Sequence, residues 1–387
     1  MIKRHLANFL IQSLREYPVV TIFGPRQSGK TTLVKSCCPN FDYITLEDRE
    51  TRDLAISDYK SLFTRHRRPL IIDEVQRVPE IVSAVQVLVD EDRTRCGQFI
   101  LTGSQQTTLA ASVDESLAGR TSVLDLLPLA LDEILPQTTD LSADELMLRG
   151  FMPELYRMNK NPTDYYRNYF RTYVERDVRQ LVNVKDLIVF ERFVTLLAGR
   201  VGQIVNLSSL AGETGVSSTT LANWLSILEA SFLIFRLPPY ITNVAKRVVK
   251  SPKIYFTDVG LATYLLGIED VKQLARDPLR GNLFENLVVA DARKSFTNRA
   301  RDPRMAVYRT EKGFEIDLML SHGSQVRPVE VKSCQTFNKD LVRNLKAYMA
   351  ADPRAVAPLL VYDGEAIEAF GPARVGVENL RSVNWVN

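Results

Sequence analysis

Short apolar runs alternate with amphipathic segments over the first third of the chain. The apolar runs lie at residues 19–23, 41–46, 70–72 and 98–103, and residues 2–17 place Leu6, Phe9, Leu10 and Leu14 on one helical face. Short apolar, β-branched runs predict buried strands, and the longer amphipathic segments predict helices. This alternation continues to about Leu135, so we expect a doubly wound α/β domain with a parallel sheet.

The pattern changes twice after this domain. It is helical from residue 141 to about 200, and residues 206–229 are typical of a helix, a glycine turn and an N-capped helix. Two short strands at 232–237 and 253–256 would form the wing of a winged helix. From about Arg280 an apolar helix precedes strands at 314–320 and 326–332, as in a small α/β domain. We therefore expect three domains, at 1–136, 137–278 and 279–387.

The first strand leads directly into a glycine-rich loop. Its residues are Gly24, Pro25, Arg26, Gln27, Ser28, Gly29, Lys30, Thr31 and Thr32, which contain the pattern G-x-x-x-x-G-K-T. Between a strand and a helix, the backbone N–H groups of such a loop surround a β-phosphate. Lys30 would reach the β and γ oxygens, and the Thr31 hydroxyl would bind Mg²⁺. The sequence therefore predicts a site for ATP with Mg²⁺.

Polar residues at later strand ends complete the predicted nucleotide site. The strand at 70–72 ends in Asp73, a Mg²⁺ ligand, and Glu74, which would polarise the attacking water. The strand at 98–103 places Thr102 and Ser104 where a γ-phosphate sensor would lie, although such residues also form ordinary strand-end turns. Arg120 is a candidate arginine finger towards a neighbouring subunit, or equally a structural salt bridge.

Two stretches of the second domain suggest contact with nucleic acid, and each has an alternative. Residues 165–179 interleave tyrosines with arginines. This pattern occurs on surfaces that stack on nucleic-acid bases. On a helix it is more often a buried aromatic face opposite a face that forms salt bridges. The helix that carries Ser217 to Asn223 could meet DNA bases, with the basic residues Lys246, Arg247, Lys250 and Lys253 on phosphates. Winged helices also serve as protein-contact modules, because fold alone does not give function.

The third domain carries a set of acidic residues and one lysine. Glu285 lies in the apolar helix, Asp317 in the first strand, and Glu330 and Lys332 in the returning strand. The turn at 322–324 brings Asp317 beside residues 329–331, and the strand period puts Glu330 and Lys332 on one face. The three carboxylates could hold one or two Mg²⁺ ions while Lys332 orients or deprotonates water, as phosphodiester hydrolysis needs. The alternative is an ordinary surface ion network.

Composition limits the possible classes of protein but does not identify a function. The 387 residues are 45% hydrophobic and 25% charged, as in ordinary soluble proteins, and the net charge of +3 is too small to establish nucleic-acid binding. The four cysteines lack metal or disulfide spacing, so we expect a reducing cytoplasm. No apolar run reaches the length of a membrane span, and we expect no membrane partner.

With these motifs, the whole chain resembles a family of prokaryotic AAA+ ATPases. Its P-loop domain is followed by a winged-helix region and a domain like the PD-(D/E)xK restriction endonucleases. The resemblance rests on residues 24–33, 70–76, 101–104, 117–120, 173–177, 251–258, 313–317 and 330–332. It implies ATP hydrolysis coupled to DNA or to a conformational switch, and homo-oligomers that are often rings. It identifies no sensor 2 arginine.

The leading hypothesis is an ATP-hydrolysing AAA+ protein that acts on DNA and carries a Mg²⁺-dependent nuclease-like module. Its candidate catalytic residues are Lys30, Glu74, Ser104, Arg120 and Lys332. One alternative is a signalling or scaffold ATPase, a STAND-like switch whose C-terminal domain binds without cutting. Another is a nucleotide-switched DNA-binding regulator.

Overall fold

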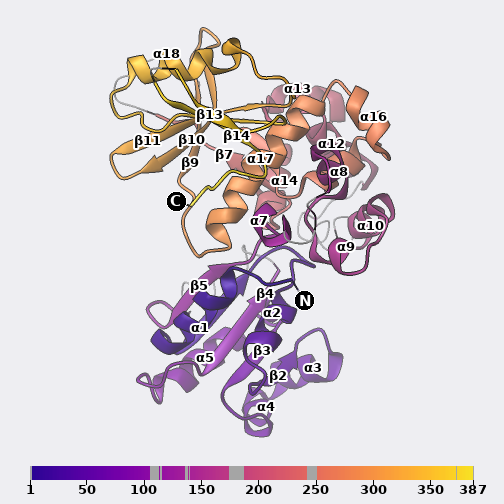
Figure 1. Cartoon of the computed structure of the whole chain (residues 1–387). Helices are drawn as coiled ribbons and strands as arrows, with labels where there is room; N and C mark the ends of the chain where they lie inside the picture. Colours follow the sequence, from indigo (N-terminus) through magenta and orange to yellow (C-terminus); the bar gives the residue numbers. More distant parts are fainter. Residues whose placement is uncertain are drawn as a thin grey trace. The chain divides into compact units, whose positions relative to one another are not determined.

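The chain divides into two units in a computed structural model that describes residues 2–104, 113, 116–135, 138, 140–173, 187–241, 251–371 and 373–386 (Figure 1). The first unit comprises Met1–Leu129 and the short segments Ala230–Phe232 and Thr297–Arg301. The second comprises Ala130–Glu229, Leu233–Phe296 and Asp302–Asn387. The finer division at residues 136 and 278 stays a prediction.

A parallel five-stranded sheet forms the centre of the first unit, which confirms the predicted α/β class. Its strand order is β2-β3-β4-β1-β5, and every neighbouring pair is parallel. The strands are β1 (Val19–Phe23), β2 (Asp42–Thr45), β3 (Leu70–Asp73), β4 (Phe99–Gly103) and β5 (Thr121–Asp125). Strand β1 lies between β4 and β5 and all five of its residues are buried, which explains why four of the five are apolar.

Helices cover both faces of this sheet. Val20 and Ile22 of β1 pack in one cluster with α1 (Leu6–Glu16) and α2 (Lys30–Cys37). Val19 and Phe23 point to the opposite face and pack with another set of helices, namely α3 (Arg49–Ser57), α4 (Tyr59–Arg65) and α5 (Ile81–Asp90). The period of two along a strand divides the side chains in this way, and the result is the doubly wound arrangement that the sequence predicts.

Two distant segments of the chain complete the first unit. Phe232, which is 2% exposed, packs in the core cluster on the α5 face. Asn298 is fully buried; its Oδ1 accepts from the Leu127 backbone N–H at 3.0 Å, and its Nδ2 donates to the Pro128 carbonyl at 3.1 Å. These contacts satisfy backbone groups just after β5, where the sheet ends.

The N-terminal part of the second unit is helical. The aromatic interpretation of residues 165–179 is supported over its described part, because Tyr165, Tyr166, Tyr169 and Tyr173 are buried and contact one another ring to ring. Residues 174–186 lie outside the described part. The helices here are α7 (Leu131–Ile134), α8 (Ala143–Arg149), α9 (Pro153–Arg157), α10 (Pro162–Tyr169), α12 (Leu187–Ala198), α15 (Val259–Leu265) and α16 (Val271–Arg276). Over the described ranges, none of the helices is both long and apolar enough to cross a bilayer.

The predicted helix–turn–helix segment forms two helices and a small sheet. Helix α13 (Leu207–Thr214) ends at Gly215, whose φ is +73°, and α14 (Ser218–Ala230) follows. Strands β6 (Gln203–Ile204), β7 (Ile234–Leu237) and β8 (Lys253–Phe256) form an antiparallel sheet in the order β6-β8-β7. The loop cations Lys246, Arg247 and Lys250 lie outside the described residues, so the winged helix and its DNA contact stay predictions.

A mixed six-stranded sheet forms the C-terminal part of the second unit. Its order is β13-β14-β12-β11-β10-β9, and α18 (Arg343–Ala351), preceded by the 3₁₀ helix Lys339–Val342, packs on one face. The strands are β9 (Met305–Arg309), β10 (Glu315–His322), β11 (Gln325–Lys332), β12 (Leu359–Tyr362), β13 (Ile367–Phe370) and β14 (Val375–Asn379), and α17 (Arg280–Thr297) precedes them. The predicted hairpin at 322–324 is present, since β10 and β11 pair antiparallel with Leu318 opposite Val329.

Candidate functional site

Residues 24–32 follow β1 at the C-terminal edge of the parallel sheet, as the phosphate-binding motif predicts. Gly24 has a φ of +153°, and a Cβ at that position would lie 2.1 Å from the Leu126 carbonyl oxygen. Gly29 has a φ of +95° and directly precedes α2. Only glycine fits these conformations without strain, so the two motif glycines are explained by the backbone itself.

Lys30 is folded back onto this loop. Its ammonium donates to the carbonyls of Gly24 at 2.8 Å and Pro25 at 2.9 Å, and the residue is 4% exposed. Burial lowers the pKa of Lys30 to about 8, although the negative charges of Glu74 and Asp73 act to raise it. A buried ammonium with only carbonyl partners favours the approach of an anion. This position therefore fits the phosphate oxygens of a nucleotide.

An arginine that the motif does not include anchors the loop. The guanidinium of Arg4, 8% exposed, donates to the carbonyls of Ser28 and Leu127, both at 2.7 Å. The Ser28 hydroxyl is buried and has no hydrogen-bond partner within the described residues. An orphaned polar atom inside a loop of this type is a further observation that fits a bound phosphate. Of the other predicted loop residues, Arg26 pairs with Glu47 at 3.5 Å.

Three hydroxyl groups surround the carboxylate of Asp73 at the end of β3. Thr31 Oγ1 donates to it at 2.9 Å, Tyr43 OH donates at 2.8 Å, and Thr102 Oγ1 donates to the other oxygen. Asp73 is 4% exposed, so these donors fix its orientation. Burial and then the Asp73 contact raise the pKa of Tyr43. A hydroxyl and a carboxylate side by side are ligands that suit Mg²⁺, and Tyr43 was not found from the sequence.

Glu74 lies in a different environment from Asp73. It has a φ of +59°, which turns its side chain away from the strand direction. Gln76 donates through Nε2 both to the Glu74 carboxylate and to Ser104 Oγ, the latter at 2.9 Å. Ser104 Oγ itself lies 3.5 Å from Glu74 Oε2. Both predicted sensor residues thus contact an acid of the site: Thr102 contacts Asp73, and Ser104 contacts Glu74.

The guanidinium of Arg120 binds to partners within the first unit. Its Nε and Nη2 donate to the two carboxylate oxygens of Asp90 at 2.8 and 3.0 Å, and its Nη1 donates to the Ala118 carbonyl at 3.1 Å. This bidentate pair is the structural salt bridge that the sequence left open as one alternative. The role of Arg120 as an arginine finger stays a prediction.

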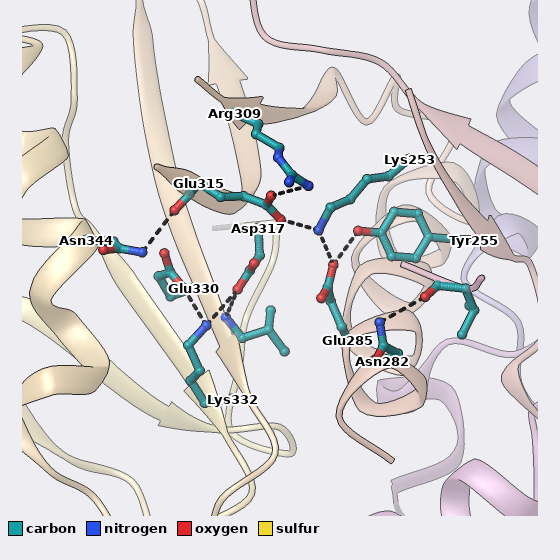
Figure 2. A network of polar contacts seen from close by, with 12 residues as sticks. Lys253, Tyr255, Asn282, Glu285, Arg309, Glu315, Asp317, Glu330, Lys332 and Asn344 are labelled. Atoms are coloured by element: carbon teal, nitrogen blue, oxygen red, sulfur yellow. Dashed lines mark hydrogen bonds and ion pairs between the residues drawn. The ribbon is translucent and has the colours of Figure 1, made fainter. Parts of the chain in front are cut away.

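The second unit brings the predicted nuclease-like residues together at the β10–β11 hairpin (Figure 2). Asp317 Oδ2 accepts from the Val331 N–H at 2.9 Å and from the Lys332 ammonium at 3.2 Å. Lys332 also donates to Glu330 Oε2 at 2.7 Å. The predicted register and the shared face of Glu330 and Lys332 are therefore observed.

Burial and mutual repulsion perturb this group. Burial and then the Asp317 charge raise the pKa of Glu330 to about 8. Burial alone would lower the pKa of Lys332, but Asp317 and Glu330 outweigh it and the pKa is raised. Lys332 therefore places a positive charge between the two carboxylates, and its role in orienting or deprotonating a water molecule stays a prediction.

Glu285 of α17 is bonded to strand β8 rather than to the hairpin that carries Asp317 and Glu330, and its role as a third metal ligand stays a prediction. Its Oε1 accepts from Lys253 Nζ at 2.8 Å and from Tyr255 OH at 2.6 Å (Figure 2). Across the described ranges, no three His, Cys, Asp or Glu side chains are grouped so as to hold a metal ion. The physical reason is that β8 supplies donors for Glu285, whereas Lys332 supplies them for the other two acids.

The remaining pair fits a divalent cation in part. Glu330 is 1% exposed, and its Oε1 is buried without a hydrogen-bond partner in the described chain. Mg²⁺ is often bound by one or two carboxylates, with water and substrate phosphates as the other ligands. Asp317 and Glu330 can provide that number of ligands. We call them the Asp317–Glu330 pair.

Three family profiles match the chain in succession. An AAA domain matches residues 16–135, a domain of unknown function (DUF8612) matches 141–272, and another (DUF4143) matches 280–379. The chain is similar to the uncharacterized proteins Mb2031c of Mycobacterium bovis and Rv2008c of Mycobacterium tuberculosis. Each is 31% identical over 373 residues, which are 94% of this chain and 80% of the relative. The Walker-type ATPase PABY2304 of Pyrococcus abyssi is 15% identical, with a TM-score of 0.45, over 68% of this chain and 96% of that protein.

Proposed function

We propose that this chain, which belongs to the family of these mycobacterial relatives and carries an AAA domain at residues 16–135, couples hydrolysis of Mg-ATP to an action on DNA. The observation that carries the nucleotide part is the arrangement of Lys30, Thr31 and Asp73 at one sheet edge. Lys30 would bind the β- and γ-phosphates in place of the loop carbonyls. Thr31 and Asp73 would hold Mg²⁺, which when bound neutralises charge on the transferring phosphoryl group.

Glu74 and its partners supply the hydrolytic step of the proposal. The Glu74 carboxylate would orient and polarise the attacking water, and Gln76 and Ser104 hold that carboxylate in place. Phosphate release from ATP tests this assignment. We expect Lys30→Ala to lose nucleotide binding, and Glu74→Gln to bind ATP while turnover falls by about 10²–10⁴-fold. Full turnover in Glu74→Gln would remove that residue from the mechanism.

The β10–β11 hairpin carries the DNA part of the proposal. Asp317 and Glu330 would hold a divalent cation, which supplies Lewis-acid stabilisation of a phosphodiester. Lys332, whose side chain is 36% exposed, would hold a phosphate oxygen by its charge. We expect the wild type to nick supercoiled plasmid in Mg²⁺ or Mn²⁺, and Lys332→Ala to lose nicking while ATP turnover persists. Lys312→Ala, at an exposed lysine of the same domain, is the matched control.

A second candidate function is a nucleotide switch of the STAND type that does not cut. The contact of Glu285 with Lys253 and Tyr255 favours it, because one of the three predicted ligands is neutralised inside the protein. Binding of plasmid in a mobility-shift experiment, with no nicks under any metal or nucleotide condition, would support this candidate. A DNA-binding regulator instead predicts sequence-specific footprints that persist with a non-hydrolysable ATP analogue.

We also propose a homo-oligomer in which Arg120 contacts nucleotide bound to a neighbouring subunit. Arg120 would have to leave Asp90 to do so. Light scattering with and without ATP measures the subunit number. Arg120→Ala should lower turnover without lowering ATP affinity, whereas a purely structural salt bridge predicts lower thermal stability alone.

A further inference from the structure

Lys253 of β8 is buried at the centre of an ion network that involves four elements of the second unit. Its ammonium is 2.8 Å from Glu285 Oε1 of α17 and 2.5 Å from Glu315 Oε1 of β10, and the side chain is 3% exposed. Arg309 of β9 contacts the other oxygen of Glu315 at 3.2 Å (Figure 2). Strand β8 thus contributes the charge of Lys253 to the nuclease-like domain. The sequence pattern predicts this lysine only as part of a DNA-binding loop.

The carboxylate of Glu285 is fixed by two donors from this one strand. Lys253 and Tyr255 are two residues apart, so they project from the same face of β8, and both reach Glu285 Oε1. Glu285 nevertheless lies close to Asp317, because Lys253 contacts both Glu285 and Glu315, and Glu315 is two residues before Asp317 on β10 (Figure 2). After burial, the charge of Asp317 raises the pKa of Glu285 to about 7. The third predicted ligand is therefore beside the Asp317–Glu330 pair but directed towards β8.

Acidic side chains outnumber basic ones in this region. Four acids meet here, Glu285, Glu315, Asp317 and Glu330, and three cations, Lys253, Arg309 and Lys332, contact them. Glu330 Oε1 remains buried without a partner among the described residues. Buried carboxylates that lie together need a counter-ion or a proton.

We propose that Lys253 is a positioning residue that holds Glu285 away from the Asp317–Glu330 pair and so limits the affinity of that pair for a divalent cation. This inference rests on the proposed nuclease-like function of the pair. When the ion pair with Lys253 is removed, Glu285 becomes a buried carboxylate beside two others. A divalent cation that all three carboxylates bind then replaces the missing positive charge.

Titration of the full chain with Mn²⁺, without nucleotide, tests the proposal by a binding readout. The loss of free Mn²⁺ signal in electron paramagnetic resonance gives the affinity. We expect Lys253→Met to bind Mn²⁺ at least about tenfold more tightly than the wild type, the size of effect that residues next to ligands commonly have. Arg309→Met, which removes a charge of the same network but no donor of Glu285, is the matched control and should change affinity by less than about threefold.

A double variant tests whether the gain needs the Glu285 carboxylate. In Lys253→Met/Glu285→Gln the affinity should return to that of the wild type, because the neutral amide that replaces the carboxylate is only a weak ligand. Equal gains in Lys253→Met and Arg309→Met, or a gain that survives in the double variant, would overturn the proposal. If circular dichroism shows that Lys253→Met does not fold, Tyr255→Phe replaces it, with an expected gain of about threefold from one lost hydrogen bond; no gain there would also overturn it.

The plasmid-nicking assay tests the proposed function separately from the Mn²⁺ titration, which tests the role of Lys253. A chain that never nicks but shows the expected Mn²⁺ affinities supports the positioning role and contradicts cleavage. A chain that nicks while Lys253→Met binds Mn²⁺ like the wild type supports cleavage and contradicts the positioning role.

Discussion

Replacing Tyr43 by phenylalanine isolates one hydrogen bond of the nucleotide site. The Tyr43 hydroxyl donates to Asp73 Oδ2 at 2.8 Å, on the same oxygen that accepts from Thr31. The ring is unchanged in Tyr43→Phe, so its stacking with the Lys35 ammonium, 3.4 Å from the ring centroid, is retained. The variant therefore removes one of the three donors that orient Asp73 and leaves the packing of the ring unchanged.

The expected size of the effect follows from the charge and the exposure of the partners. A hydrogen bond to a charged group contributes about 1.5–3 kcal/mol. Asp73 is buried but Tyr43 is only half-buried, and Thr102 remains as a donor, so the low end of about 1.5 kcal/mol applies. Since about 1.4 kcal/mol is a factor of ten, the Mg²⁺ concentration for half-maximal ATP turnover should rise about tenfold.

Phosphate release at saturating ATP, measured over a series of Mg²⁺ concentrations, provides the assay. Tyr59→Phe removes a hydroxyl from an exposed tyrosine of the same unit and is the matched control. Binding of ATP in EDTA should be the same in both variants, because Lys30 and the loop are untouched. Identical Mg²⁺ dependence in Tyr43→Phe, Tyr59→Phe and the wild type would refute the role assigned to Tyr43.

Three further predictions concern other parts of the chain. Burial and then Cys37 raise the pKa of Cys38 to about 11, from 9.0 in the unfolded chain. The stabilising contribution of Cys38 is therefore present below about pH 9 and is lost as the pH rises towards 11. At pH 8, alkylation of Cys38 should be about a hundredfold slower in the folded protein than in urea, whereas the exposed Cys96 should show no such difference. Gly260→Ala should lower the free energy of unfolding by about 1–3 kcal/mol, because its Cβ would lie 2.6 Å from the Tyr166 ring. Gly212→Ala, in a helix with open space around it, should raise stability by about 0.5–1 kcal/mol in the same urea titration, and the opposite order would contradict the packing described here. Arg4→Ala removes two charge-assisted bonds to backbone carbonyls and should lower both Tm and ATP affinity, whereas exposed Arg15→Ala should change neither, as differential scanning fluorimetry and a fluorescent ATP analogue can measure.

Features that depend on neighbours in sequence were predictable. The phosphate-binding loop is contiguous, and its glycines and Lys30 occupy the positions that a strand–loop–helix requires. The hairpin at 322–324 fixes the register of Asp317 against Glu330, because one turn sets the pairing of both strands. In both cases the relevant spacing is local.

Features that depend on distant parts of the chain were not predictable in the same way. Arg4 contacts Leu127, 123 residues away, and nothing in the pattern around either residue indicates the other. Lys253 and Tyr255 lie in a segment that the sequence analysis had marked, but their contact with Glu285 requires β8 to meet α17. An acid in an apolar stripe indicates that a partner exists without showing which one, so the sequence does not reveal the contact of Glu285 with Lys253.

The first unit draws on three separate parts of the chain, and this has a consequence for dissection and for evolution. A gene fragment that stops at residue 136 encodes every nucleotide-binding motif but lacks Phe232 and Asn298. Without Phe232 this fragment would expose an apolar surface, and without Asn298 two backbone groups after β5 would lose their hydrogen-bond partner. Because the two units are interleaved along the sequence, they are inherited as one piece, and a single crossover that exchanged one would damage the other.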